Sequence, residues 1–220
     1  MPKAILFDLD GTLLDRDRSL LDFVRAQYDR ISAFRHVDKP AFVRRFIELD
    51  AKGYVWKDRV YQSLLSEFQA DHSWEALLED YIDGFRHHCV GFPGLHEMLG
   101  HLRDKGLKLA IITNGYTRFQ ENNIMALQLP PYFDEIVVSE REGVRKPDPE
   151  IFHRALRRLN VTPGEAVYVG DHPANDIRAA RQAGMRAVWK EDAYYAKPDE
   201  ANWTIRQLSE ISALADHLLP

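Results

Sequence analysis

The chain has 220 residues, of which 45% are hydrophobic and 29% charged, and its formal net charge is -5. This length and composition predict one globular α/β domain with a modest insertion and argue against two large independent domains. The negative net charge argues against a nucleic acid polymer as a partner. The single cysteine, Cys89, excludes an intramolecular disulfide and fits a reducing compartment.

No basic and then apolar leader precedes the first predicted strand, and no apolar run approaches the roughly 20 residues that cross a bilayer. We therefore expect a cytoplasmic protein without a membrane partner, either a monomer or a homodimer.

Short apolar runs bounded by turn residues predict the strands of one buried sheet. These runs are Ala4–Leu9, Lys108–Thr113, Glu135–Ser139, Ala166–Gly170, Arg186–Trp189 and Asn202–Ile205. Apolar residues recur at helical spacing in Leu95–Leu102, Ile151–Leu159 and, after the last strand, Leu208–Leu219. The alternation of strands and helices indicates parallel pairing with right-handed crossovers. The predicted fold class is α/β, with a three-layer, Rossmann-like parallel sheet as its core.

The long interval from about Ser19 to His88 has no convincing strand but several amphipathic helical stretches. It predicts an all-helical insertion after the first strand. We place this insertion at residues 16–91, as a cap on a core of residues 1–15 and 92–220. A helical lobe rooted at the carboxyl end of a strand is well placed to cover whatever binds there.

Two carboxylates, Asp8 and Asp10, come where the first apolar run ends in a glycine turn. Ligands of open α/β sheets bind at the carboxyl ends of the strands. The pair therefore indicates a cation site, covalent chemistry or both, although a polar turn that merely ends the strand has the same pattern.

Groups that suit a phosphate follow the second and third predicted strands. Thr113 and Asn114 stand where a hydroxyl, an amide and backbone N–H groups meet the start of a helix. Helix capping is the alternative role for either residue. Lys146 lies beyond the third strand, next to prolines that hold the backbone extended. Its ammonium can neutralise a transferring phosphoryl group or keep a nearby carboxylate ionised.

Two more carboxylates follow the fourth strand, at Asp171 and, five residues on, Asp176. Together with Asp8 they can complete a cation site. Oxygen ligands without cysteine favour Mg²⁺ over zinc. His172 is an alternative metal ligand, but a single histidine in a turn is more often a hydrogen-bond partner or exposed to solvent.

Taken together and in this order, the motifs resemble those of the haloacid dehalogenase-like (HAD) hydrolase superfamily, from Lys3 to about Trp189. Asp8-x-Asp10-Gly11-Thr12 is similar to its first motif, Thr113 to its second, Lys146 to its third, and Gly170-Asp171 with Asp176 to its fourth. The helical insertion resembles the C1-type cap of subfamily I. The resemblance implies a phosphatase that acts on a small phosphorylated metabolite.

The resemblance also implies roles for the carboxylates. Asp8 would attack phosphorus and form an aspartyl-phosphate, while Asp10 would act first as acid and then as base. Mg²⁺ would be held by the Asp8 side chain, the Asp10 backbone carbonyl and Asp171, with Asp176 in the shell around them.

The remaining motif residues would bind the phosphoryl group. Thr113 and the Asn114 backbone would hold phosphoryl oxygens, and Lys146 would stabilise charge on the nucleophile and the transition state. Asp10 favours phosphorus over carbon as the target, because the dehalogenase branch lacks an acid at this position.

Several alternatives stay open at this point. A phosphonatase would need a Schiff-base lysine, for which Lys52 and Lys57 are candidates by location only. A phosphomutase of the same superfamily, or a regulatory protein that binds phosphate without turnover, would keep the same motifs. The substrate is expected to be a nucleoside monophosphate, a sugar phosphate or phosphoglycolate. A basic and aromatic stretch of the insertion offers candidates for substrate contacts: Lys52, Tyr54, Trp56, Lys57 and Arg59. The helical spacing of Trp56 and Tyr61 instead favours a place in the core of the insertion.

Overall fold

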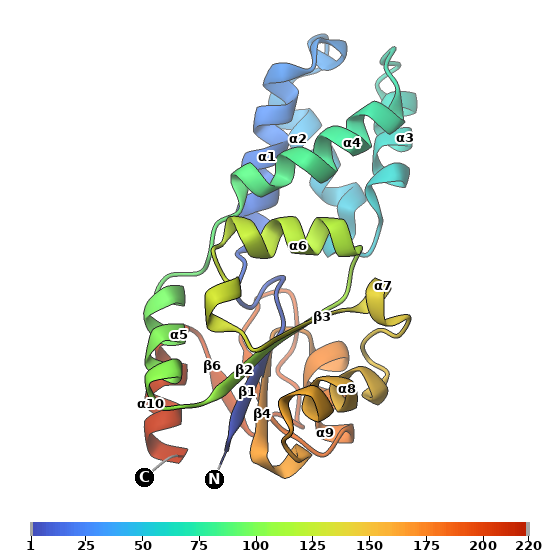
Figure 1. Ribbon diagram of the computed structural model, residues 1–220. Helices are drawn as coiled ribbons and strands as arrows, with labels where there is room; N and C mark the ends of the chain where they lie inside the picture. Colours follow the sequence, from blue (N-terminus) through green and yellow to red (C-terminus); the bar gives the residue numbers. More distant parts are fainter. Residues whose placement is uncertain (1, 219–220) are drawn as a thin grey trace. The chain divides into compact units, whose positions relative to one another are not determined.

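The computed structural model describes residues 2–218 and divides into two compact units (Figure 1). One unit comprises the residues up to Asp15 together with those from Gly91 onward, and the other is Arg16–Val90. Among residues 2–218, all the strands lie in the first unit, and the second unit is entirely helical apart from its connections.

Six parallel strands form one sheet in the first unit, in the order β3-β2-β1-β4-β5-β6. Their bounds are β1 (Ala4–Phe7), β2 (Lys108–Thr113), β3 (Glu135–Val138), β4 (Ala166–Gly170), β5 (Arg186–Lys190) and β6 (Trp203–Ile205). The predicted α/β fold class with a parallel, Rossmann-like sheet is confirmed. The strand order reverses between β1 and β4, so the carboxyl ends of these two strands form the crevice where such sheets bind ligands.

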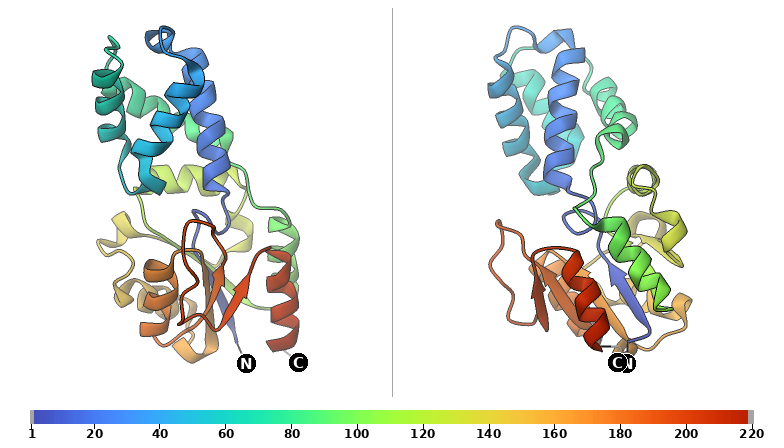
Figure 2. Two further views of the ribbon diagram at one scale, coloured as in Figure 1. Left: turned by 180° about the vertical axis from the view of Figure 1, so that it is seen from behind. Right: turned by 90° about the vertical axis from the view of Figure 1, so that its left-hand side faces the viewer.

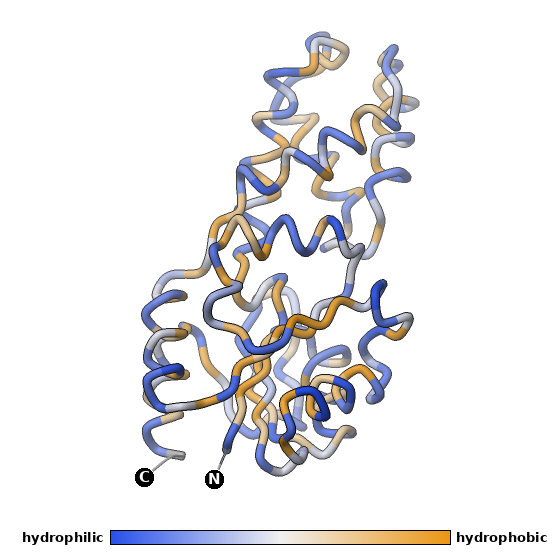
Figure 3. Tube along the Cα trace, viewed as in Figure 1, coloured by the Kyte–Doolittle hydropathy of each residue, from blue (hydrophilic) through white to orange (hydrophobic). Residues whose placement is uncertain are grey.

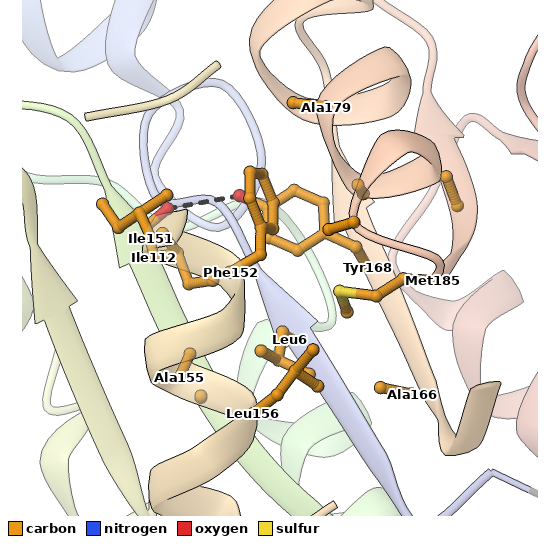
Figure 4. Packing of buried hydrophobic residues seen from close by; sticks show 14 of the residues in the cluster. Leu6, Ile112, Ile151, Phe152, Ala155, Leu156, Ala166, Tyr168, Ala179 and Met185 are labelled. Atoms are coloured by element: carbon orange, nitrogen blue, oxygen red, sulfur yellow. Dashed lines mark hydrogen bonds between the residues drawn. The ribbon is translucent and has the colours of Figure 1, made fainter. Parts of the chain in front are cut away.

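Side chains alternate along the strands, so each face of the sheet has its own core. Leu6 and Tyr168 point to the face covered by α8 (Pro149–Leu159) and α9 (Ala179–Gln182). Figure 4 shows this packing, in which the Phe152 ring of α8 meets the Tyr168 ring edge-on with centroids 5.0 Å apart.

The opposite face of the sheet packs on the C-terminal helix. Ile5 and Val167, which alternate with the residues of the first face, lie against Ile211 of α10 (Ser209–Leu218). Helix α5 (Leu95–Asp104) lies beside α10, and His101 contacts Asp216 across them at 2.9 Å. Figure 3 shows the matching pattern, with hydrophobic colours along β2 and β3 and alternating colours along the helices. The last residue of the predicted final helix, Leu219, lies outside the described residues.

Shorter helices complete the first unit. They are α6 (Thr117–Ala126), α7 (Ser139–Glu142), the 3-10 turns Pro130–Tyr132 and Pro163–Glu165, and a π-helical turn at Pro173–Arg178 that runs into α9. Neither α7 nor the π-helical turn is predicted from the apolar pattern, because elements of four to six residues show too few periods to detect.

The second unit contains four helices, visible in both views of Figure 2. They are α1 (Arg16–Arg30), α2 (Lys39–Asp50), α3 (Lys57–Glu67) and α4 (Trp74–Gly84), joined by 3-10 turns at Ser32–Phe34, Ala51–Gly53 and, after α4, Phe85–His88. Asp38 and Ser73 cap α2 and α4, since their side chains accept from Ala41 N and Ala76 N at 3.1 Å. Within residues 2–218, no helix has both the length and the apolar character needed to span a bilayer.

The core of the helical unit is mainly aromatic. Phe42 contacts the rings of both Phe34 and Phe46, and the Tyr81 ring meets Phe23 edge-on at 5.3 Å. Lys57, one of the residues considered for substrate contacts, starts α3 inside this core, where its side chain forms an ion pair with Asp50. Aromatic packing and a buried ion pair therefore hold this unit together.

Candidate active site

Asp8 stands at the carboxyl end of β1, where its backbone N–H donates to Val169 O of β4 at 2.9 Å. Its side chain is nearly buried, with 6% of the residue exposed. The chain then turns at Gly11, whose φ of +83° suits glycine. A Cβ there would lie 2.5 Å from Oδ2 of Asp171, so the turn can approach this carboxylate only with glycine.

The ammonium group of Lys146 joins the ends of β1 and β4. Its Nζ donates to Asp8 Oδ1 at 2.6 Å, to Asp176 Oδ1 at 2.7 Å and to the Tyr168 hydroxyl at 3.0 Å. Burial alone would lower the pKa of Lys146, but Asp176 and Asp8 outweigh that effect and raise the pKa well above its usual value. Lys146 is therefore a fixed positive charge beside Asp8.

Asn114 fixes the backbone of Lys146. Its side-chain Oδ1 accepts from Lys146 N, and its Nδ2 donates to Lys146 O, both at 2.9 Å. This pair of bonds ties the end of β2 to the segment after β3. The Asn114 side chain is thus engaged with protein, and the phosphate role predicted for its backbone stays a prediction.

Asp176 uses both carboxylate oxygens. Oδ1 accepts from Lys146 and, at 3.2 Å, from the Tyr168 hydroxyl, while Oδ2 accepts from the backbone N–H of His172 at 2.9 Å. A Cβ on Gly170 would lie 2.4 Å from the Cβ of Asp176, so glycine is needed where β4 ends. Asp176 therefore orients Lys146 and the loop around it.

His172, the alternative metal ligand, caps the π-helical turn. Its Nδ1 accepts from the backbone N–H groups of Ala174 and Asn175 at 3.0 and 3.1 Å, and its ring lies 4.9 Å from that of Tyr195. These contacts match the hydrogen-bonding role that a lone histidine in a turn usually has.

Three carboxylates converge at this edge of the sheet. Single oxygens of Asp8, Asp171 and Asp176 all lie within 4.8 Å of one another. Burial, opposed by Lys146, raises the pKa of Asp8 well above its usual value. Burial and the nearby Asp176 raise the pKa of Asp171 to about 7. A divalent cation with oxygen ligands would relieve this repulsion, so the donor set fits Mg²⁺.

Asp10 and Thr113 meet at a side chain that is not singled out in the sequence. Nε2 of Gln120 lies 2.6 Å from Asp10 Oδ2 and 2.8 Å from Thr113 Oγ1. The Asp10 carboxylate is outside the cluster of three carboxylates, and its predicted metal contact through the backbone carbonyl stays a prediction.

Comparison with known proteins identifies the family. Residues 5–190 match the haloacid dehalogenase-like hydrolase family. The chain belongs to this family. This confirms the predicted superfamily, and the match covers the β1, β2, β3, β4 and β5 strands from which the site is built.

Individual HAD hydrolases match over nearly the whole chain. The glyceraldehyde 3-phosphate phosphatase of Pyrococcus furiosus is 30% identical over 223 residues, which cover 95% of this chain and 91% of the relative. The phosphoglycolate phosphatase of Psychrobacter arcticus is 28% identical over 229 residues, covering 99% and 96%. A solved structure of a HAD phosphatase from Thermococcus onnurineus is 32% identical with a TM-score of 0.71, covering 99% of this chain and 98% of that chain. The prediction of a phosphatase agrees with these names.

Other residues of this HAD hydrolase support the site without a motif of their own. Tyr168 lies in the apolar run of β4, where a hydroxyl in an otherwise buried strand is a detectable signal. Lys190 ends β5 and donates to Gly11 O at 2.9 Å, and Trp189 Nε1 donates to Asp171 O at 2.7 Å. The end of β5 thus braces the turns that carry Gly11 and Asp171.

Proposed function

We propose that this HAD hydrolase is a Mg²⁺-dependent phosphomonoester hydrolase that forms an aspartyl-phosphate on Asp8. One observation carries the proposal. Oδ1 of Asp8 lies 2.6 Å from the buried ammonium nitrogen of Lys146. One oxygen of Asp171 and one of Asp176 lie within 4.8 Å of an oxygen of Asp8. A nucleophile flanked by one fixed cation, and by carboxylates that can hold a second, can approach an anionic phosphoryl group.

In the first step, an oxygen of Asp8 forms a bond to phosphorus as the bond from phosphorus to the leaving oxygen breaks. The leaving oxygen keeps the electron pair and takes a proton from Asp10. Lys146 holds Asp8 in place and offsets negative charge on the transferring group. Mg²⁺, held by Asp8, Asp171 and the Asp10 carbonyl, would supply further charge neutralisation when bound.

In the second step, Asp10 takes a proton from water, and the water oxygen forms a bond to phosphorus as the bond to Asp8 breaks. This step releases inorganic phosphate and restores both carboxyl groups. Thr113 and the Asn114 backbone are proposed to bind phosphoryl oxygens at the end of β2. Asp176 is proposed to act through Lys146, to which it is hydrogen-bonded at 2.7 Å.

The substrate is proposed to be a small phosphorylated metabolite, in line with the names of the relatives. The helical insertion at residues 16–91 is proposed as the cap that selects among such substrates, while the core at 1–15 and 92–220 carries the chemistry. A panel of nucleoside monophosphates, sugar phosphates, glyceraldehyde 3-phosphate and phosphoglycolate tests the selection. Equal rates on all of them would indicate a generalist.

Hydrolysis of p-nitrophenyl phosphate with Mg²⁺ and with a chelator tests the activity. We expect turnover that needs Mg²⁺ and disappears in Asp8→Asn. The matched control is Asp199→Asn, which makes the same change at an exposed site and should retain full activity. Turnover that persists unchanged in Asp8→Asn would overturn the proposal. Release of inorganic phosphate, rather than an isomeric sugar phosphate, separates a hydrolase from a phosphomutase.

A further inference from the structure

Gln120 of α6 is a buried polar side chain that has no role in the proposed mechanism. It is only 2% exposed, and its amide nitrogen lies 2.6 Å from Asp10 Oδ2, 2.8 Å from Thr113 Oγ1 and 3.0 Å from Asn114 O. Its Oε1 accepts from Asn123 Nδ2 at 3.3 Å. One amide therefore contacts the proposed acid and the proposed phosphate-binding residues together.

The hydrogen-bond partners fix the orientation of the Gln120 amide. An ionised carboxylate and a backbone carbonyl can only accept, so the group that faces Asp10 and Asn114 O must be the NH₂ group. The amide has two hydrogens for three acceptors, Asp10 Oδ2, Thr113 Oγ1 and Asn114 O, so one hydrogen is shared between two of them. The reverse orientation would place the amide oxygen against two other acceptors and is excluded on chemical grounds.

This orientation determines where two other protons lie. Asp10 Oδ2 accepts from Gln120, so the proton that Asp10 transfers lies on its other oxygen, Oδ1. The Thr113 hydroxyl cannot donate to an amide nitrogen that has no available lone pair. Among residues 2–218, Thr113 Oγ1 has one hydrogen-bond partner, the Gln120 amide, from which it accepts. The hydrogen of the Thr113 hydroxyl is therefore available for a phosphoryl oxygen.

We propose that Gln120 is a positioning residue, whose amide aims the Asp10 proton at the leaving oxygen and the Thr113 hydrogen at the phosphoryl group. This inference rests on the proposed phosphomonoester hydrolysis. Gln120 itself contacts neither the substrate nor the atoms that react. Its effect on the rate acts through the geometry of Asp10 and Thr113.

The test compares two aryl phosphates of similar shape. Phenyl phosphate has a basic leaving group that needs the acid, whereas p-nitrophenyl phosphate has a good leaving group that needs it less. The measured quantity is kcat/KM, which reports the first phosphoryl transfer. We expect Gln120→Met to lower kcat/KM on phenyl phosphate at least about tenfold more than on p-nitrophenyl phosphate, since general acids contribute roughly 100-fold or more.

Gln27 offers a matched control in the helical unit. It is also a buried glutamine, and its Nε2 donates to the Asp80 carboxylate at 2.9 Å. Gln27→Met removes the same kind of bond and should lower stability without changing the ratio of the two kcat/KM values. Equal losses on both substrates in Gln120→Met would show a merely structural role and would overturn the proposal.

Two further measurements keep the inference separate from the proposed function. In an Asp10→Asn background, Gln120→Met should no longer change the ratio of the two kcat/KM values, because the acid is absent. Gln120→Met should also weaken inhibition by inorganic phosphate through Thr113, and an unchanged inhibition constant would overturn that part.

If wild-type protein hydrolyses neither ester, the proposed function fails. If wild type is active, Asp8→Asn is inactive and Gln120→Met changes both substrates equally, only the role of Gln120 fails.

Discussion

Each unit of the molecule contains a buried cluster of lysine and aspartate, and the two clusters have opposite compositions. At the ends of β1 and β4, Lys146 stands among Asp8, Asp176 and the nearby Asp171. In the helical unit, a single carboxylate, Asp50, is the partner of two cations. Nη2 of Arg16 lies 2.9 Å from both Asp50 oxygens, and Lys57 pairs with Oδ1.

The pKa values show what this difference means. Burial would raise the pKa of Asp50, but Lys57 and Arg16 outweigh it and lower the pKa below its usual value. Burial raises the pKa of Asp8 despite the attraction of Lys146. Cations of the same unit therefore balance the charge of Asp50, whereas the carboxylates of the strand-end cluster outnumber their one cation, Lys146. An unbalanced buried charge cluster in a cleft indicates a functional site, and a balanced one indicates a structural role.

The largest expected effect is on catalysis in the strand-end cluster. Lys146→Met should lower kcat on p-nitrophenyl phosphate about 1000-fold, because it removes the fixed positive charge beside Asp8. Steady-state kinetics at saturating Mg²⁺ measures the change. Lys197→Met, at an exposed position, is the control. A loss below about tenfold would place Lys146 outside the transition-state interactions.

The next effect is on stability in the helical cluster. Lys57→Met should lower the free energy of unfolding by about 3 kcal/mol, because one partner of a buried ion pair is lost. The value is expected at the lower end of the usual range, since Arg16 still pairs with Asp50. Urea denaturation followed by circular dichroism gives the number. A change within about 0.5 kcal/mol, as at an ordinary surface position, would contradict the structural role.

Mg²⁺ should stabilise the folded protein only by binding to the strand-end cluster. At a concentration about 100 times its dissociation constant, Mg²⁺ should raise the free energy of unfolding by about 2.7 kcal/mol. The shift should be lost in Asp171→Asn and retained in Asp50→Asn. Denaturation with and without Mg²⁺ tests all three proteins. An equal shift in wild type and Asp171→Asn would place the ion elsewhere.

The smallest effect is the pH dependence of the helical cluster. The folded pKa of Asp50 is lower than its usual 3.8, so the unfolded chain binds its proton first as pH falls. The stabilisation by the carboxylate is therefore complete above pH 3.8 and is lost as pH falls through the folded pKa. The slope for one proton is at most about 1.4 kcal/mol per pH unit. In denaturation experiments, the free energy of unfolding of wild type should exceed that of Asp50→Asn at pH 7, and the excess should shrink as the pH is lowered. An excess that does not change with pH would contradict the ion pair.

The sequence predicts the sheet well because its strands are short apolar runs between turn residues, and β2 and β4 match the predicted ranges. Asp8, Lys146 and Asp171 are predictable as candidates because each follows a strand, so parallel topology gathers them at one edge. Gln120 is not predictable in the same way. It meets Asp10 across 110 positions of sequence, and that contact depends on how α6 packs. The burial of Lys57 is not predictable either, because a lysine beside aromatic residues has the same local pattern whether it is buried or exposed.

The central claim is that the unbalanced strand-end cluster makes Asp8 the residue that accepts the phosphoryl group. Borohydride quenching during turnover tests it most directly, because it reduces an aspartyl-phosphate to homoserine, which peptide mass spectrometry can locate. The account predicts homoserine at position 8 only when substrate and Mg²⁺ are both present. An unmodified Asp8 in protein that is hydrolysing substrate, or homoserine at another aspartate, would contradict it.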